Sequence, residues 1–189
     1  MIKSLSKRIV SYLINLEVID NSEESVAYYS YGAEITISSF INVLLVLFVG
    51  AITSNFFESI TFLLCFIPLR QFTGGYHANT YFKCNFLFTL LFSIMLLIYR
   101  IILPYFSIYA AIIMLLFNIV TLISKCPVEN KNKPLTDKQK KKYKCLAVTL
   151  GLFYSFIGVI SKVFSYNIGV IFIFTSVLVS ILVIVATIQ

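Results

Sequence analysis

Apolar residues are gathered into six runs along the chain, and polar segments separate these runs. Several runs reach or approach the length of about 18 residues that a helix needs to cross a bilayer. The shorter runs must be completed by polar flanking residues, or the bilayer must thin around them. The runs are Ile35–Ile52, Ser59–Leu69, Cys84–Ile98, Tyr105–Ile123, Cys145–Ile160 and Ile168–Ile188. The pattern predicts an all-α integral membrane protein with about six transmembrane helices.

The first 33 residues show a different pattern, which is typical of amphipathic helices at a membrane surface. Asp20, Asn21 and Ser22 offer an N-cap, and Glu23 and Glu24 then lie in the first turn of a second predicted helix. In the first helix, apolar side chains recur at steps of three or four residues, opposite the cations: Ile2, Leu5, Ile9, Leu13 and Leu16. We therefore divide the chain into an interfacial region, residues 1–33, and a polytopic transmembrane domain, residues 34–189.

The composition supports a membrane protein and excludes a soluble one. The chain is 59% apolar and 12% charged, whereas soluble domains are about 45–50% apolar and about 25% charged. Its net charge is +7, and thirteen of its fifteen Lys and Arg residues lie in residues 1–34, 70–83 and 124–144. The remaining loops hold only Arg100 and Lys162. Because cytosolic loops carry the excess of cations, we predict that both termini and loops 70–83 and 124–144 face the cytosol.

The chain has four cysteines and one histidine, and none of the cysteines stands in a paired motif. Cys65, Cys84, Cys126 and Cys145 lie far apart, and the cytosol keeps thiols reduced. One histidine and one nearby thiol fall short of the three or four ligands of zinc, so we expect no metal and no cofactor. Three of the thiols are expected to be packing residues, since a free cysteine behaves as a small buried hydrophobe.

The polar loop between the second and third runs brings the histidine and one cysteine close together in sequence. It reads R-Q-F-T-G-G-Y-H-A-N-T-Y-F-K-C, with His77 seven residues before Cys84. A thiol with a neighbouring base is the minimum equipment of a thiol nucleophile. A nearby His or a helix N-terminus lowers the pKa of a thiol from about 8.5.

An unbroken helix would separate His77 and Cys84 by about 10.5 Å along its axis, which is too far for a catalytic pair. Gly74 and Gly75 permit turns that other residues resist. We therefore predict a break in the helix between Gly74 and about Thr80, with Asn79 or Thr80 capping the next helix.

Other interpretations of these residues remain open. A lone histidine is often a surface residue, and a lone cysteine is often a packing residue. A small transporter or peptide exporter would need charged or polar groups along its spans, but the spans are nearly free of charge. A scaffolding subunit would not need the loop. Glu34 is expected to play a structural part, with Arg70 as candidate partner, while Gln71, Asn79 and Asn118 are candidates to orient His77 or hold an oxyanion.

Arg70, Gly74, Gly75, His77 and Cys84 together resemble the signature of the accessory gene regulator B family. The segment from Tyr31 to Ile35, the pair Cys126-Pro127 and the segment from Lys131 to Pro134 are also similar to that family. Its members are integral-membrane cysteine endopeptidases of Gram-positive bacteria that process a quorum-sensing propeptide.

The resemblance implies a role for each residue of the loop. His77 would be the general base and Cys84 the nucleophile, and Arg70 and Gly75 match motif positions that support activity. The partner would be a short propeptide with an amphipathic N-terminal helix, a central signal segment and an acidic tail. Cleavage after the signal segment would leave a thioester on Cys84, and a Cys or Ser of the substrate would then close a thiolactone or lactone ring. The family further suggests a homodimer in the cell membrane, and we expect no nucleic-acid partner.

Eight lysines lie between Lys125 and Lys144, with Glu129 and Asp137 among them. Such a segment would attract an acidic substrate tail. The alternative is that the lysines only set the topology or bind anionic lipid. The candidates for substrate binding are Lys131, Lys133, Lys140, Lys141 and Lys142.

Overall fold

The computed structural model of the chain describes residues 2–74, 80–129, 135–164 and 166–188, and helices dominate these residues. Two short 3-10 helices, Leu103–Tyr105 and Asn167–Gly169, lie beside the longer ones. The α-helices are α1 (Ile2–Asn15), α2 (Glu23–Ile52), α3 (Phe56–Thr73), α4 (Tyr81–Ile102), α5 (Ile108–Lys125), α6 (Asp137–Val163) and α7 (Val170–Ile188).

Six helices of the described chain are long and apolar enough to cross a membrane, which confirms the all-α transmembrane prediction. They extend beyond the apolar runs because polar residues cap their ends. Thr80 accepts a hydrogen bond from the Lys83 backbone at the start of α4, and Ser107 accepts one from Ala110 at the start of α5. Thr136 begins α6 with a reciprocal capping box. Polar flanks therefore complete the short spans, as expected.

The N-terminal region differs from the prediction in one respect. The second interfacial helix and the first span form one continuous helix, α2, of 30 residues. Ser22 caps it as expected and accepts a hydrogen bond from the Ser25 backbone at 3.3 Å. No proline interrupts the segment, and Gly32 faces open space, so nothing ends the helix near residue 33. The boundary between residues 33 and 34 therefore does not coincide with a helix end.

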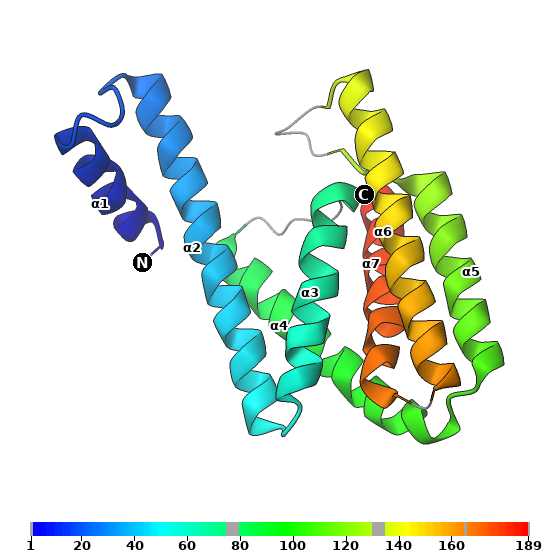
Figure 1. Cartoon of the computed structure of the whole chain (residues 1–189). Helices are drawn as coiled ribbons and strands as arrows, with labels where there is room; N and C mark the ends of the chain where they lie inside the picture. Colours follow the sequence, from blue (N-terminus) through cyan, green and yellow to red (C-terminus); the bar gives the residue numbers. More distant parts are fainter. Residues whose placement is uncertain (1, 75–79, 130–134, 165, 189) are drawn as a thin grey trace.

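Helix α1 packs against α2 through a narrow face that includes the buried residues Ser6 and Val10. Leu5, Ile9 and Leu16, which belong to the predicted apolar face, remain exposed. An exposed apolar face beside the contact with α2 suits a helix that rests on a membrane surface. In Figure 1, α1 and α2 stand to one side of the bundle that α3, α5, α6 and α7 form.

Small residues on α6 allow the bundle to pack closely. Its buried positions are Ala147, Gly151, Ser155 and Gly158. A Cβ atom on Gly151 would overlap Leu122 of α5, and one on Gly158 would overlap Ile173 of α7. Since lipid gives helices no hydrophobic reason to associate, close packing at small residues is what holds such helices together.

Asn118 of α5 lies in a buried hydrogen-bond network at the centre of this bundle. Its amide nitrogen donates to the Gly151 carbonyl at 3.2 Å and to the Ser155 hydroxyl at 2.8 Å. Its amide oxygen accepts from Ser180 of α7 at 2.6 Å. The prediction that Asn118 could serve the loop chemistry is therefore wrong, because its polar groups join α5, α6 and α7.

Helix α3 contains Pro68, which removes one backbone donor inside a span. The hydrogen bond that is lost would have gone to the carbonyl of Leu64, four residues earlier. The Tyr154 hydroxyl of α6 donates to this carbonyl instead, at 3.1 Å. The freed backbone oxygen is thus satisfied within the protein, as a bilayer environment requires.

Helix α4 is inclined to its neighbours and crosses behind α3 (Figure 1). Near its C-terminal end, Tyr99 donates to the Asn167 carbonyl at 3.0 Å and its ring meets Phe174 of α7. In its middle, Phe88 and Phe92 lie against Phe62 of α3, with ring centroids 5.7 and 4.8 Å apart. The N-terminal turns of α4, which carry Cys84, lie against α2.

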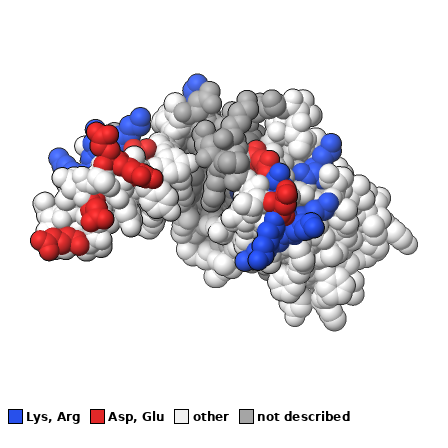
Figure 2. Space-filling model, turned by 90° about the horizontal axis from the view of Figure 1, so that it is seen from above, with Lys and Arg blue, Asp and Glu red and all other residues white. Residues whose placement is uncertain are grey.

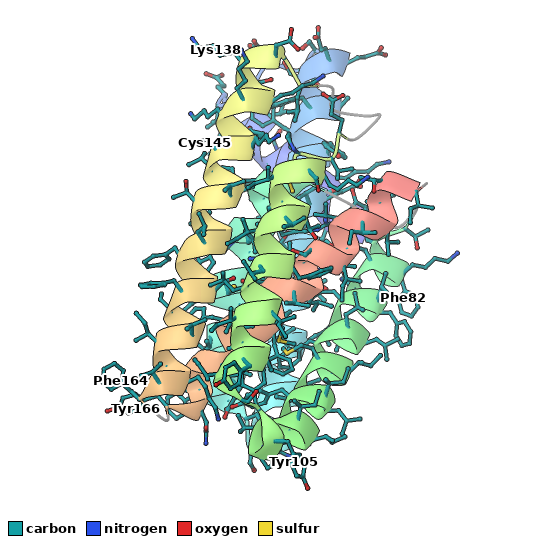
Figure 3. All side chains as sticks on the ribbon, turned by 90° about the vertical axis from the view of Figure 1, so that its right-hand side faces the viewer. Phe82, Tyr105, Lys138, Cys145, Phe164 and Tyr166 are labelled. Atoms are coloured by element: carbon teal, nitrogen blue, oxygen red, sulfur yellow. The ribbon has the colours of Figure 1, made fainter. Side chains whose placement is uncertain are left out.

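The orientation in the membrane can be tested by labelling introduced cysteines. Tyr105 and Tyr166 are 87% and 69% exposed and lie at the end of the molecule opposite Lys138 (Figure 3). With the lysine-rich end in the cytosol, a membrane-impermeant maleimide added to intact cells should label Tyr105→Cys and Tyr166→Cys. It should label Lys138→Cys only after the cells are opened. Labelling of position 138 in intact cells would reverse the orientation.

Candidate active site

The C-terminal end of α3 forms one side of the candidate site. The helix ends at Thr73, and Gly74 follows with a φ of 66°, a value that favours glycine. A Cβ atom on Gly74 would also overlap the Val128 carbonyl. The Val128 backbone donates to the Thr73 carbonyl at 2.9 Å. Gly74 therefore allows the segment after α5 to lie directly against the end of α3.

Arg70 binds the same turn and brings a positive charge to it. Its guanidinium donates to the Gly74 carbonyl, and the Thr73 hydroxyl donates to that oxygen at 3.2 Å. The guanidinium is also close enough to the thiols of Cys84 and Cys126 for its charge to act on both. Arg70 therefore links the end of α3, the start of α4 and the segment that follows α5.

Cys84 lies in the first turns of α4, as predicted. Thr80 caps this helix with an extended backbone, and the Cys84 backbone donates to the Thr80 carbonyl at 3.0 Å. The thiol is neither buried nor fully exposed. A helix N-terminus and a nearby cation both stabilise negative charge on sulfur, so this position suits a nucleophilic thiolate.

The predicted break before Cys84 is confirmed, because α3 ends at Thr73 with Gly74 as its C-cap and α4 begins only after its N-cap, Thr80. The cap is Thr80, one of the two residues that we considered. Gly75, His77 and Asn79 lie outside the described residues. The pairing of His77 with Cys84 therefore stays a prediction.

Glu34 occupies a different place from the one that we considered. The Ser6 hydroxyl of α1 donates to its carboxylate at 3.4 Å, and the Tyr81 hydroxyl of α4 lies close enough for the Glu34 charge to act on it. The ion pairs of the described residues do not include one between Glu34 and Arg70. Glu34 faces α1 and the first turn of α4, whereas the Arg70 guanidinium turns back toward Gly74, so the expected pairing is wrong.

Sequence reasoning missed the residue next to Cys84. Asn85 is buried, and its side-chain oxygen accepts from the Ser38 hydroxyl of α2 at 2.7 Å. Both residues are polar and stand in apolar runs, which was the available signal. The sequence could not show that they meet, because they lie 47 positions apart.

The other cysteines separate into two kinds. Cys65 and Cys126 are buried, which confirms them as packing residues. Burial raises the pKa of Cys126 to about 12, although Lys144 and Arg70 oppose this shift. Cys145 is exposed on the outside of α6 (Figure 3), so the expectation that it is buried is wrong. It lies two positions before Ala147 and therefore faces away from the buried side of the helix.

The first turns of α6 carry a lysine cluster, which we define as Lys138, Lys140, Lys141, Lys142 and Lys144. Figure 2 shows cations gathered on this side of the molecule, with acidic residues among them. Lys140 forms an ion pair with Glu129 at 2.8 Å, so part of its charge is neutralised, while Lys141 and Lys142 are exposed. Lys131 and Lys133 lie outside the described residues.

The placement of the thiols predicts an order of reactivity toward iodoacetamide in the folded protein at pH 7. Cys84 should react fastest because a cation and a helix N-terminus stabilise its thiolate, and exposed Cys145 should follow. Buried Cys126 should react more slowly than either, because a thiol with a pKa of about 12 is only about 10⁻⁵ ionised at pH 7. Peptide mass spectrometry after timed alkylation measures each rate. Reaction of Cys126 at the rate of Cys145 would contradict the burial described here.

A sequence profile of the accessory gene regulator B family matches residues 6–187 of the chain. AgrB-like protein 2 of Clostridium perfringens strain 13 is 28% identical over 178 residues, which cover 89% of this chain and 81% of the relative. An AgrB-like protein of strain SM101 is 27% identical over the same shares of both chains. AgrB-like protein 1 of strain 13 is 30% identical over 135 residues, or 69% of this chain and 70% of the relative. No solved structure matches the chain. Because the profile covers nearly all of the sequence, this multi-pass membrane protein belongs to the accessory gene regulator B family.

Proposed function

We propose that this protein is a membrane cysteine endopeptidase that cleaves a quorum-sensing propeptide on the C-terminal side of its signal segment. Membership of the family already links the chain to the processing of accessory gene regulator peptides. The observation that carries the finer proposal is the position of Cys84, at the start of α4 and within reach of the Arg70 charge. Cys84 serves as the nucleophile and His77 as the general base.

In the first step, the Cys84 thiolate attacks the carbonyl carbon of the scissile peptide bond. The C–N bond breaks, and the amine of the tail leaves with a proton from the His77 imidazolium. The signal segment remains on Cys84 as a thioester. The Arg70 guanidinium, near this sulfur, stabilises the negative charge that develops during the attack.

In the second step, a Cys or Ser of the bound signal segment attacks the thioester, and His77 accepts its proton. The Cys84 thiolate leaves, and a thiolactone or lactone ring closes. Exchange of one thioester for another changes little in bond type, so water must be kept away or hydrolysis will compete. The partial burial of Cys84, at the start of α4 beside α2, supports such exclusion.

The lysine cluster would receive the acidic tail of the propeptide at the cytosolic surface. Lys141 and Lys142 are the main candidates, because Lys140 is already engaged by Glu129. Lys131 and Lys133 belong to the same segment of sequence. We further propose that the enzyme works as a homodimer in the membrane of a Gram-positive bacterium, with its active site toward the cytosol.

Substitution of the nucleophile tests the proposed chemistry. Cys84→Ser should abolish cleavage of a coexpressed propeptide, because an alcohol is far less acidic than a thiol. His77→Ala should lower the rate by about 10²–10⁴-fold, the usual contribution of a general base. Cys145→Ala, a change at an exposed thiol on the outside of α6, should leave the rate unchanged. Immunoblots of propeptide and tail measure cleavage, and protease activity in Cys84→Ser at the wild-type rate would disprove the assignment.

Substitution of two exposed lysines tests the binding of the tail. Lys141→Gln and Lys142→Gln together should raise KM at low salt, and the difference from wild type should shrink as salt screens the charges. Lys162→Gln removes a cation outside the cluster and serves as the control. The measurement is processing in vesicles over a range of ionic strength. An unchanged KM at every salt concentration would leave the cluster with a topological role only.

A further inference from the structure

We propose that Glu34 and Ser38 of α2 are positioning residues, which fix the height and rotation of the first turns of α4 and thereby the place of Cys84. The Ser38 hydroxyl donates to the Asn85 side chain at 2.7 Å, and the Glu34 carboxylate lies near enough to the Tyr81 hydroxyl for its charge to act on it. The proposal deepens the proposed function, on which its processing assay rests. Its chemical assay does not depend on that function.

The two contacts have matching spacing on the two helices. Glu34 and Ser38 are four residues apart on α2, and Tyr81 and Asn85 are four residues apart on α4. Residues at this spacing lie on one face of a helix, about one turn apart. The pairs therefore form two successive rungs of one polar seam between α2 and α4, which we call the α2–α4 seam.

Cys84 lies inside the length of this seam. It follows Tyr81 by three residues and precedes Asn85 by one, so its sulfur projects next to the seam and about 100° from Asn85 around the helix. One hydrogen bond would allow α4 to pivot about a single point. The Ser38–Asn85 hydrogen bond on one side of Cys84 in sequence, and the Glu34 carboxylate beside Tyr81 on the other, together fix both the axial position and the rotation of this turn.

Burial and a contact from α1 hold the residues of the two rungs in place. Ser38 and Asn85 are buried, so a hydrogen bond lost between them is not replaced by water. Ser6, which is fully buried in α1, donates to Glu34 and holds the carboxylate from the other side. The remaining contacts of α4 that we describe involve Phe88, Phe92 and Tyr99, which all lie farther along the helix. The buried Ser38–Asn85 contact therefore ties the start of α4 to α2.

The test compares Ser38→Ala with Thr36→Ala on the same helix. Thr36 is a matched control because it is exposed and its hydroxyl bonds only the Gly32 carbonyl of its own helix, at 2.9 Å. In propeptide processing, Ser38→Ala should lower kcat by about 10- to 100-fold, because a small displacement of a reacting group is costly. KM should stay within about two-fold of wild type, because Ser38 is not expected to touch the substrate. Ser38→Thr, which keeps the hydroxyl, should recover most of the loss.

A second readout is the pH profile of Cys84 alkylation by iodoacetamide in the folded protein. Displacement of the sulfur from Arg70 should shift the midpoint of this profile in Ser38→Ala and in Glu34→Ala, but not in Thr36→Ala. Equal kcat and equal profiles in Ser38→Ala and Thr36→Ala would overturn the proposal. If wild type cleaves no propeptide while the alkylation profile still shifts, the proposed function fails and the positioning role stands.

A cross-link tests the seam even if Ser38→Ala does not fold. In a Cys84→Ala background, the pair Ser38→Cys and Asn85→Cys should form an intramolecular disulfide in oxidised membranes. The pair Thr36→Cys and Asn85→Cys should not, because Thr36 faces away from α4. Cross-linking of both pairs to the same extent, or of neither, would show that the seam does not hold α4 in this register.

Discussion

Every backbone carbonyl of α3 must find a donor inside the protein, because lipid supplies none. Pro68 frees the Leu64 carbonyl, and Tyr154 of α6 donates to it. At the helix end, Arg70 donates to the Gly74 carbonyl and the Val128 backbone donates to Thr73. These donors come from three separate parts of the chain. The requirement to satisfy α3 therefore draws α6 and the segment after α5 to it, and it holds the Arg70 guanidinium at the Gly74 carbonyl, where its charge reaches the thiol of Cys84.

Hydrogen bonds between polar side chains within the spans also hold neighbouring helices together. The network around Asn118 joins α5, α6 and α7, and the α2–α4 seam joins the two helices on the other side of α3. Each network has a distinct consequence. The first makes a compact bundle at small residues such as Gly151, where no Cβ atom could fit. The second secures only the start of α4, which is the part of that helix that carries the candidate nucleophile.

The sequence was sufficient to predict the features that depend on local chemistry. Six spans follow from the length and hydropathy of the apolar runs, the turn at Gly74 follows from the glycine, and the start of α4 follows from Thr80. The sequence was insufficient to predict side-chain partners wherever the rotation of a helix about its axis decides which residues meet. In a helix that is apolar on all sides, periodicity does not tell which face is buried. The partners of Glu34, Asn85 and Asn118 could therefore not be read from the sequence, and Cys145 was assigned to the wrong side of α6.

Arg70 is near two thiols, so its charge alone does not explain why one of them should be the nucleophile. Cys84 stands in the first turn of α4, where the helix dipole favours negative charge, whereas Cys126 is the C-cap of α5, where the dipole opposes it. Burial adds to the contrast, since Cys126 is 6% exposed and its pKa is raised to about 12. The same guanidinium therefore acts on one thiol that can ionise and on one that stays neutral. The positions of the two cysteines at opposite kinds of helix end are what favour Cys84 over Cys126 as the proposed nucleophile.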